Sequence, residues 1–136
     1  MAQTTLLSAT ITTALTADTS GGVALVNLDN YGAVALQCNF AYGSGGTNAK
    51  FWVQSSLDGG TTWHDVACFA ATTASKKRIY NLSNRTAVST IATPTDGTLA
   101  DDTSVDGILG DRLRVKTTTT GTYAGSTTVV ISAVPH

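Results

Sequence analysis

The chain has 136 residues and a net charge of −1, and 42% of its residues are hydrophobic whereas only 12% are charged. This length suits one domain with a real core, and the apolar share argues against a chain that is disordered throughout. The small net charge excludes nucleic-acid binding driven by overall charge, and no apolar run is long enough to span a membrane as a helix.

Residue usage predicts strands and not helices. The sequence contains 25 Thr, its nine acidic residues are all Asp, and it has no Glu. Thr favours strands, whereas Thr, Asp and Gly are poor helix formers. A surface with so few charges must be solvated by hydroxyl groups or covered by partners. We therefore expect an all-β protein.

Residues 1–17 carry no charged side chain and mix Thr with Leu and Ile, so they fit either a first strand or an extended N-terminal arm. No basic region precedes the apolar stretch, so we expect no secretory signal. A Gly-containing turn cluster follows at 18–22, and residues 23–28 then predict a short buried strand.

Seven further segments have strand-like patterns. Residues 33–42 alternate, with Val34 and Leu36 on one face and Ala35 and Gln37 on the other. The turn at 58–60 predicts a hairpin, and a proline marks one segment as an edge because it cannot donate to a ladder. The segments are 33–42, 49–57, 62–70, 75–83, 86–94, 112–120 and 127–134, with a long Asp-rich loop at 95–111.

Eight or nine short strands, separated by turn signals and without a sustained helical period, predict an antiparallel β-sandwich or jelly-roll-like fold. The sequence has no internal repeat and no boundary in composition. Residues 1–136 are therefore expected to form one domain.

The most distinctive motif is the stretch "SSLDGGTTW" at 55–63. It matches the Asp-box pattern Ser-x-Asp-x-Gly-x-Thr-Trp, which recurs once per blade in sialidases and other β-propellers. An Asp at the head of a tight hairpin accepts backbone N–H groups, and Gly supplies positive φ without strain. Because the box occurs once in a chain too short for a propeller, we favour a structural turn over a sugar contact. Its residues are Ser56, Asp58, Gly60, Thr62 and Trp63.

Other chemically active residue types are scattered. His64 and His136 have no second His or Cys at a metal-ligand spacing, so zinc is not expected. Cys38 and Cys68 are expected to be free thiols that pack as small hydrophobic residues, in a chain made in a reducing cytosol. No catalytic residue and no cofactor is predicted.

Two kinds of charged cluster leave alternatives open. Four carboxylates could offer oxygens to Ca²⁺, but they lack EF-hand spacing, and we favour a solvated loop. These are Asp96, Asp101, Asp102 and Asp106. The basic groups are solvated faces by default, and one of them could dock an acidic protein partner. That candidate docking group is Arg112, Arg114 and Lys116, and the other group is 76–78.

Two longer patterns stand out in the chain. A V-x-x-S-x-D-G-G-T-x-W strand–turn–strand occupies 53–63, and a G-D-x-L-R-V-K-x-x-x-x-G-T-Y-x-G segment occupies 110–125. In both patterns the chain resembles a group of small structural proteins encoded by tailed bacteriophages, and the resemblance covers most of residues 33–134. The N-terminal third is less distinctive.

This resemblance implies a capsid decoration, or cement, protein on the virion surface, made in the bacterial host cytoplasm. The implied partners are the major capsid protein and further copies of the chain in a homotrimer. Contact with nucleic acid or a membrane is not implied, and a small-molecule ligand is not expected.

Two other functions remain as alternatives. The first is a carbohydrate- or receptor-binding module on the virion surface or tail, for which Trp52 is the candidate exposed aromatic residue. It falls on the strand face opposite Phe51 and Val53. The second is a glycosidase, which needs two carboxylates in a cleft. It is disfavoured because no pair of Asp residues stands out.

Overall fold

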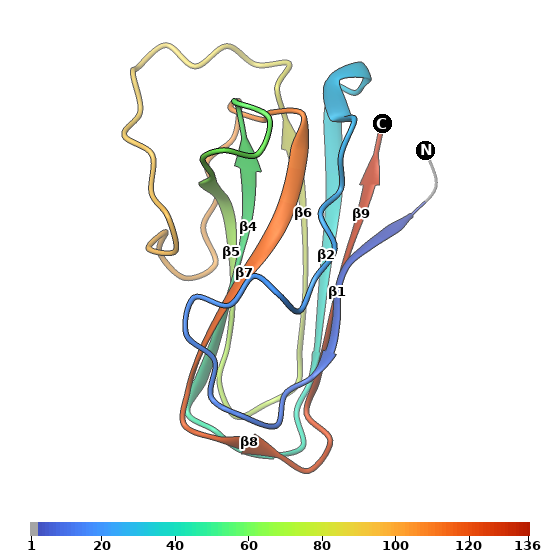
Figure 1. Cartoon of the computed structure of the whole chain (residues 1–136), viewed down its shortest axis with the longest axis vertical. Helices are drawn as coiled ribbons and strands as arrows, with labels where there is room; N and C mark the ends of the chain where they lie inside the picture. The colour runs from blue at the N-terminus through green and yellow to red at the C-terminus, as the bar shows by residue number, and fades with distance from the viewer. Residues whose placement is uncertain (1–2) are drawn as a thin grey trace.

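The computed structural model describes residues 3–136, which form a two-sheet β-sandwich (Figure 1). Its strand pairs are antiparallel. The all-β sandwich prediction is therefore confirmed. The elements are β1 (Thr4–Thr10), η1 (Leu28–Asn30, a short 3-10 turn), β2 (Ala33–Ala41), β3 (Ser44–Gly45), β4 (Asn48–Ser56), β5 (His64–Ala71), β6 (Lys76–Ser83), β7 (Arg112–Thr120), β8 (Tyr123–Ala124) and β9 (Thr128–Pro135).

The strand order is that of a jelly roll. One sheet has the order β1-β9-β2-β6, the other has β5-β4-β7, and the β3–β8 ribbon closes one end. Residues 15–25 run beside β7 in place of a further strand, with backbone bridges from Asp18 to Thr117 and from Leu25 to Leu113. When this segment is counted as the second strand, consecutive principal strands lie in opposite sheets except at the β4–β5 hairpin. Jelly rolls share this connectivity.

Of the N-terminal segment 1–17, residues Thr4–Thr10 form a first strand, whereas residues 11–17 are not in a strand. β1 pairs with β9 along its length. Leu6, Leu7 and Ile11 are buried in the core, and the Ile11 N–H donates to the carbonyl of Thr127 at 2.9 Å. The first two residues of the predicted arm lie outside the described residues.

The core lies between the two sheets, and the edge strand β6 contributes only Leu82 to it. The predicted alternation of β2 is confirmed, because the inward row is buried from Val34 to Phe40 whereas Ala35, Gln37, Asn39 and Ala41 of the outward row are not. At the end closed by the β3–β8 ribbon, the buried Tyr123 stands edge-on to Phe40 with ring centroids 5.7 Å apart. Its hydroxyl donates to the carbonyl of Thr72 at 2.8 Å. A Cβ on Gly46 would lie 2.4 Å from this ring, so only glycine fits there.

Two predicted strands are wrong. In residues 23–28 only Leu25 and Leu28 are buried, and Asn27 has a φ of 63°, which interrupts an extended chain. Residues 86–94 form no strand, and all their side chains are exposed. The Val residues of 23–28 and the Thr, Val and Ile residues of 86–94 favour strands. However, residues 23–28 form only one bridge to β7, at Leu25, and residues 86–94 pair with no described strand.

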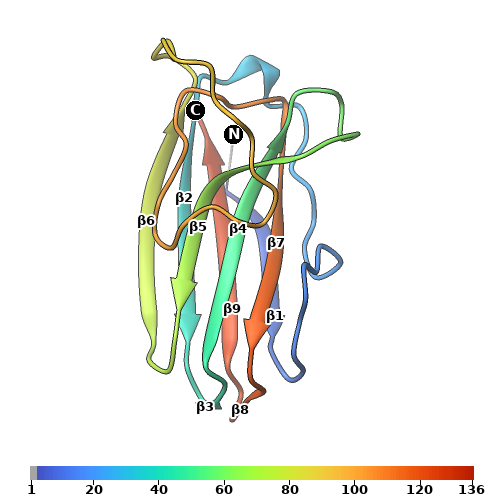
Figure 2. The same ribbon diagram turned by 90° about the vertical axis from the view of Figure 1, so that its left-hand side faces the viewer.

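Residues 84–111 form one long connection that passes over the outer side of the β5-β4-β7 sheet (Figure 2). Backbone hydrogen bonds join this connection to the β5 edge at Asp65, Val66 and Cys68. As a consequence, β4 is buried on both faces: Val53 faces the core of the sandwich, and Trp52 lies beneath the connection. Connections of this length without strands of their own are uncommon in small domains. Here residues 95–105 act as a third layer.

A buried carboxylate holds this layer in place. Asp65 on β5 is 2% exposed. Its oxygens accept the backbone N–H groups of Gly97, Thr98 and Leu99 at 2.9 to 3.1 Å. The hydroxyl of Thr95 and the amide of Gln54 each donate to it at 2.8 Å. Burial by itself would raise the pKa of Asp65, but these donors outweigh it and hold the pKa below its ordinary value.

Substitution Asp65→Ala is expected to lower the free energy of unfolding by about 2 to 3 kcal/mol, because several donors to one buried charge lose their acceptor. Urea unfolding measures this change. The matched control is Asp101→Ala in the same connection, which removes an exposed ion pair to Lys50 of 2.9 Å and should cost less than about 1 kcal/mol. Equal losses for the two variants would contradict the role assigned to Asp65.

Candidate functional site

The Asp-box residues form a closed network of hydrogen bonds at the β4–β5 turn. Asp58 accepts the backbone N–H and the hydroxyl of Thr62 at 2.8 and 2.6 Å, and also the hydroxyl of Ser56 at 2.9 Å. The Ser56 oxygen accepts the N–H of Gly60 at 2.8 Å. The indole N–H of Trp63 donates to the Gly60 carbonyl at 3.0 Å. The five residues therefore come together as predicted. The hydrogen bonds described here all join groups of the turn to one another.

The electrostatics of the turn follow from these contacts. Hydrogen bonds from the side chain and backbone of Thr62, and then from Ser56, lower the pKa of Asp58 to about 2. The two glycines after it have φ of 72° and 94°, a region that other residues rarely adopt. A side-chain carboxylate that is already saturated by its own turn is a structural cap. This geometry fits the predicted structural turn.

The predicted docking group, Arg112, Arg114 and Lys116, lies on one row of β7 but is engaged within the chain. The Arg114 guanidinium lies 4.4 Å from the centre of the Trp63 ring and donates to Gln54 at 2.9 Å. Lys116 pairs with Asp96 at 2.6 Å, and Arg112 pairs with Asp111 at 3.2 Å. The three side chains are only partly exposed, so a docking role for them stays a prediction.

The Asp residues of the long connection pair with lysines on the sheets. Asp96, Asp101 and Asp102 contact Lys116, Lys50 and Lys76 at 2.6 to 2.9 Å, and Asp106 accepts the backbone N–H of Ser83 at 2.6 Å. Within residues 3–136, no group of three or more His, Cys, Asp or Glu is arranged to hold a metal ion. The ion pairs explain why so acidic a segment follows the sheet closely.

Both cysteines are buried free thiols, as predicted. Burial is the main cause that raises the pKa of Cys38 to about 12 and that of Cys68 to about 11. A thiol with so high a pKa stays protonated and is a poor nucleophile at neutral pH.

Trp52 is buried, so its prediction as an exposed aromatic residue is wrong. It is 5% exposed, and its indole N–H donates to the Leu99 carbonyl at 3.0 Å. The strand face that carries it is the outer face of its sheet, but the third layer covers that face. Alternation along a strand identifies the two faces and not what covers each of them.

One exposed surface is the segment 86–93, which we call the displayed segment. It contains no charged residue, and its side chains are all exposed, with Ile91 at 99%. None of its backbone N–H groups donates a hydrogen bond to another described residue. Its two ends are fixed, because Ser83 is bound by Asp106 and Thr95 is bound by Asp65. The displayed segment is therefore an uncharged loop held away from the sandwich.

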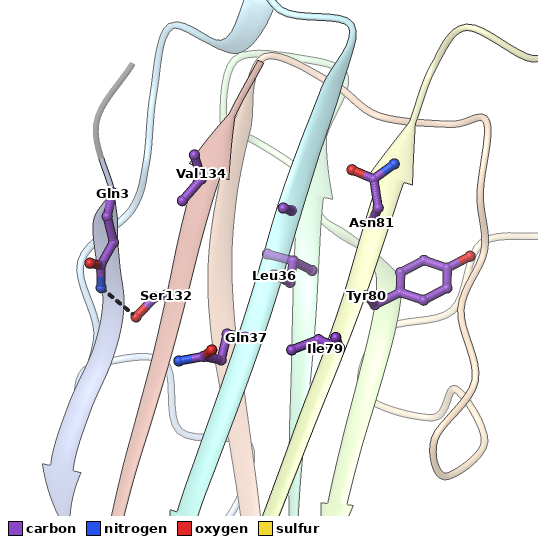
Figure 3. Close-up of a pocket in the computed structure, with 9 residues that line it drawn as sticks. Gln3, Leu36, Gln37, Ile79, Tyr80, Asn81, Ser132 and Val134 are labelled. Atoms are coloured by element: carbon purple, nitrogen blue, oxygen red, sulfur yellow. Dashed lines mark hydrogen bonds between the residues drawn. The ribbon is translucent and has the colours of Figure 1, made fainter.

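A second exposed surface is the outer face of the β1-β9-β2-β6 sheet, which we call the open face. Its centre is a hollow of about 600 Å³ on the outer side of the strands (Figure 3). Across it, the strand register places Gln37 between Ile79 and Ser132, and Ala35 between Asn81 and Val134. Ile79 is 75% exposed and Val134 is 38% exposed. The central side chains are aliphatic, amide or hydroxyl groups.

Sequence reasoning identified the turn but missed Asp65, Ile91 and the open face. The signal for Asp65 was a carboxylate directly before the apolar run of residues 66–71. Ile91 could not be recognised, because its segment has strand-like composition.

In the described part of the chain, no helix is long and apolar enough to cross a membrane. None of the family models, curated proteins and solved structures with which we compared the chain matches it.

The pH dependence of the Asp-box turn can be tested with Asp58→Asn. The folded pKa of about 2 lies below the ordinary value of 3.8, so the charged form stabilises the fold fully above about pH 4. That stabilisation is lost as the pH falls towards 2. The variant should melt below the wild type at pH 7, and the gap should close between pH 4 and 2. Asp29→Asn is the control, and a gap that stays constant with pH would contradict the assignment.

Proposed function

We propose that this protein is a non-enzymatic structural component of a phage particle that decorates the capsid shell. In this proposal it lies on the outside of the shell and binds the major capsid protein through the displayed segment. The observation that carries the proposal is Ile91, an aliphatic side chain at 99% exposure in an uncharged loop with fixed ends. Single exposed aliphatic residues are common, but here a whole segment is kept from the core.

The fold supports presentation of a loop. Binding residues often lie on loops positioned by a rigid scaffold. The carboxylate of Asp65, the indole of Trp52 and three Asp–Lys ion pairs fasten the rest of the connection to the sandwich. Most charged side chains described above are thus occupied in holding the connection, while the displayed segment carries no charge. Because the displayed segment is neutral, it can contact a capsid subunit without electrostatic repulsion. For the same reason, the displayed segments of the many copies on a shell do not repel one another.

The resemblance to small phage structural proteins points in the same direction. Its two motifs have structural roles in this chain, because the first closes the β4–β5 turn and the second supplies β7 and the buried Tyr123. The carbohydrate-binding alternative loses its specific candidate, because Trp52 is covered. We therefore retain decoration of the shell as the proposed function.

Binding of the purified protein to heads that lack it tests this proposal. Burying one Ile side chain contributes about 2 kcal/mol, so Ile91→Ser should weaken co-sedimentation with heads about 30-fold. The melting temperature should not change, because the side chain has no packing to lose.

The matched control is Val23→Ser, which changes another exposed aliphatic residue, at 68% exposure, outside the displayed segment. It should leave binding unchanged. The copy number in purified particles gives a second result: hundreds of copies over the shell support decoration. A few copies at one vertex, or no binding by the wild type to heads, would overturn it.

A further inference from the structure

The two sheets of the sandwich differ in what covers their outer faces. The third layer covers the β5-β4-β7 sheet, so that Trp52 and Gln54 of β4 are buried. The open face has no such layer among the described residues, and Ile79 on it is 75% exposed. This surface is distinct from the displayed segment, which leaves the top of β6 and crosses towards the other side of the sandwich (Figure 1).

The chemistry of the open face matches that of a second copy of itself. Lys77 is the one charged residue that the register places on the outward rows of β2, β9 and β6. The polar groups at the centre that are open to a partner are the amides of Gln37 and Asn81, because Ser132 is only 6% exposed and its hydroxyl accepts from the amide of Gln3 at 2.9 Å. Each of these groups both donates and accepts hydrogen bonds. Two such faces can therefore pair without burying an unmatched charge, whereas a charged face repels its own copy.

The size of the open face also suits a pair of chains. Four strands about 4.8 Å apart and about 28 Å long give a face of roughly 500 Å² per copy before side-chain relief is counted. Stable interfaces bury about 800 Å² per partner, and weak ones less. A pair formed through this face should be reversible and depend on concentration.

We propose that the open face binds the open face of a second copy of this chain around a twofold axis. Gln37 lies near the axis, with Ile79 and Val134 packing against their counterparts. A twofold interface is made of the same patch on both copies, and here the one charged residue of that patch, Lys77, lies on the edge strand β6. This inference does not depend on binding to a shell.

Sedimentation equilibrium over a range of concentrations tests the pairing. The wild type should form dimers, and Ile79→Asp should raise the dissociation constant at least tenfold. The melting temperatures of the two chains should agree at concentrations low enough for both to be monomeric, because dimerisation itself stabilises the folded state. Val23→Asp is the matched control and should dimerise like the wild type. A wild type that stays monomeric up to millimolar concentration would overturn the proposal. So would a trimer that Ile79→Asp leaves intact.

A cysteine placed at the axis gives an independent measurement. Gln37→Cys should form a disulfide-linked dimer under mild oxidation, because the two copies of this position approach each other. Thr90→Cys, in the displayed segment, should give little of this product. Equal cross-linking of the two variants would overturn the face-to-face arrangement. Loss of binding to heads by Ile79→Asp, from a wild type that is monomeric, would assign the open face to the shell instead.

Discussion

The carboxylate of Asp65 is the interaction on which the arrangement of this molecule depends. It is buried on β5, where an unpaired charge would be costly. Five groups donate to it, and three of them are consecutive backbone N–H groups of residues 97–99. The chain therefore cannot leave the surface of the β5-β4-β7 sheet without exposing these donors and losing their acceptor. A long connection becomes a layer of the structure.

The other surfaces follow from that layer. The connection covers Trp52 and pairs Lys116 of β7 with Asp96. The neighbouring Arg114 is held by Gln54 of β4 and by the ring of Trp63. The hydrogen bonds and ion pairs that fasten the connection to the sheet do not involve the displayed segment, residues 86–93. Among the described residues no such layer covers the opposite sheet, and its outer face, on which Lys77 is the one charged residue of β2, β9 and β6, remains available. The outer face of the β5-β4-β7 sheet is thus covered by the connection of the same chain, whereas the open face can be covered by a second copy.

Sequence patterns predicted correctly those strands and turns whose conformation is favoured both by their own residues and by their packing in the fold. The alternation in 33–42 and 112–120 predicted β2 and β7, and the Asp box predicted the β4–β5 turn together with its hydrogen bonds. These features depend on residues that are close in sequence. The pattern also placed Trp52 on the face opposite Phe51, which is correct. Its burial depends on Leu99, far away in the chain, and no periodicity within β4 encodes that contact.

The two strands that were predicted wrongly lack this agreement: their residues favour a strand, but their surroundings do not. Residues 86–94 have the composition of a strand, but a strand needs a partner, and the chain at this point is crossing between the two sheets. Residues 23–28 do run beside β7, yet Asn27 turns the backbone and leaves a single bridge at Leu25. Composition describes what a segment can do, and its neighbours decide what it does.

Native-state hydrogen exchange at the amides of Gly97, Thr98 and Leu99 tests the central claim most directly. If the Asp65 carboxylate holds the connection as a layer, these amides are protected to nearly the same degree as the amides of β5, although they lie in a loop. The amides of residues 86–93 should exchange freely in the same sample. Rapid exchange at Gly97, Thr98 and Leu99, equal to that of the displayed segment, would contradict the account.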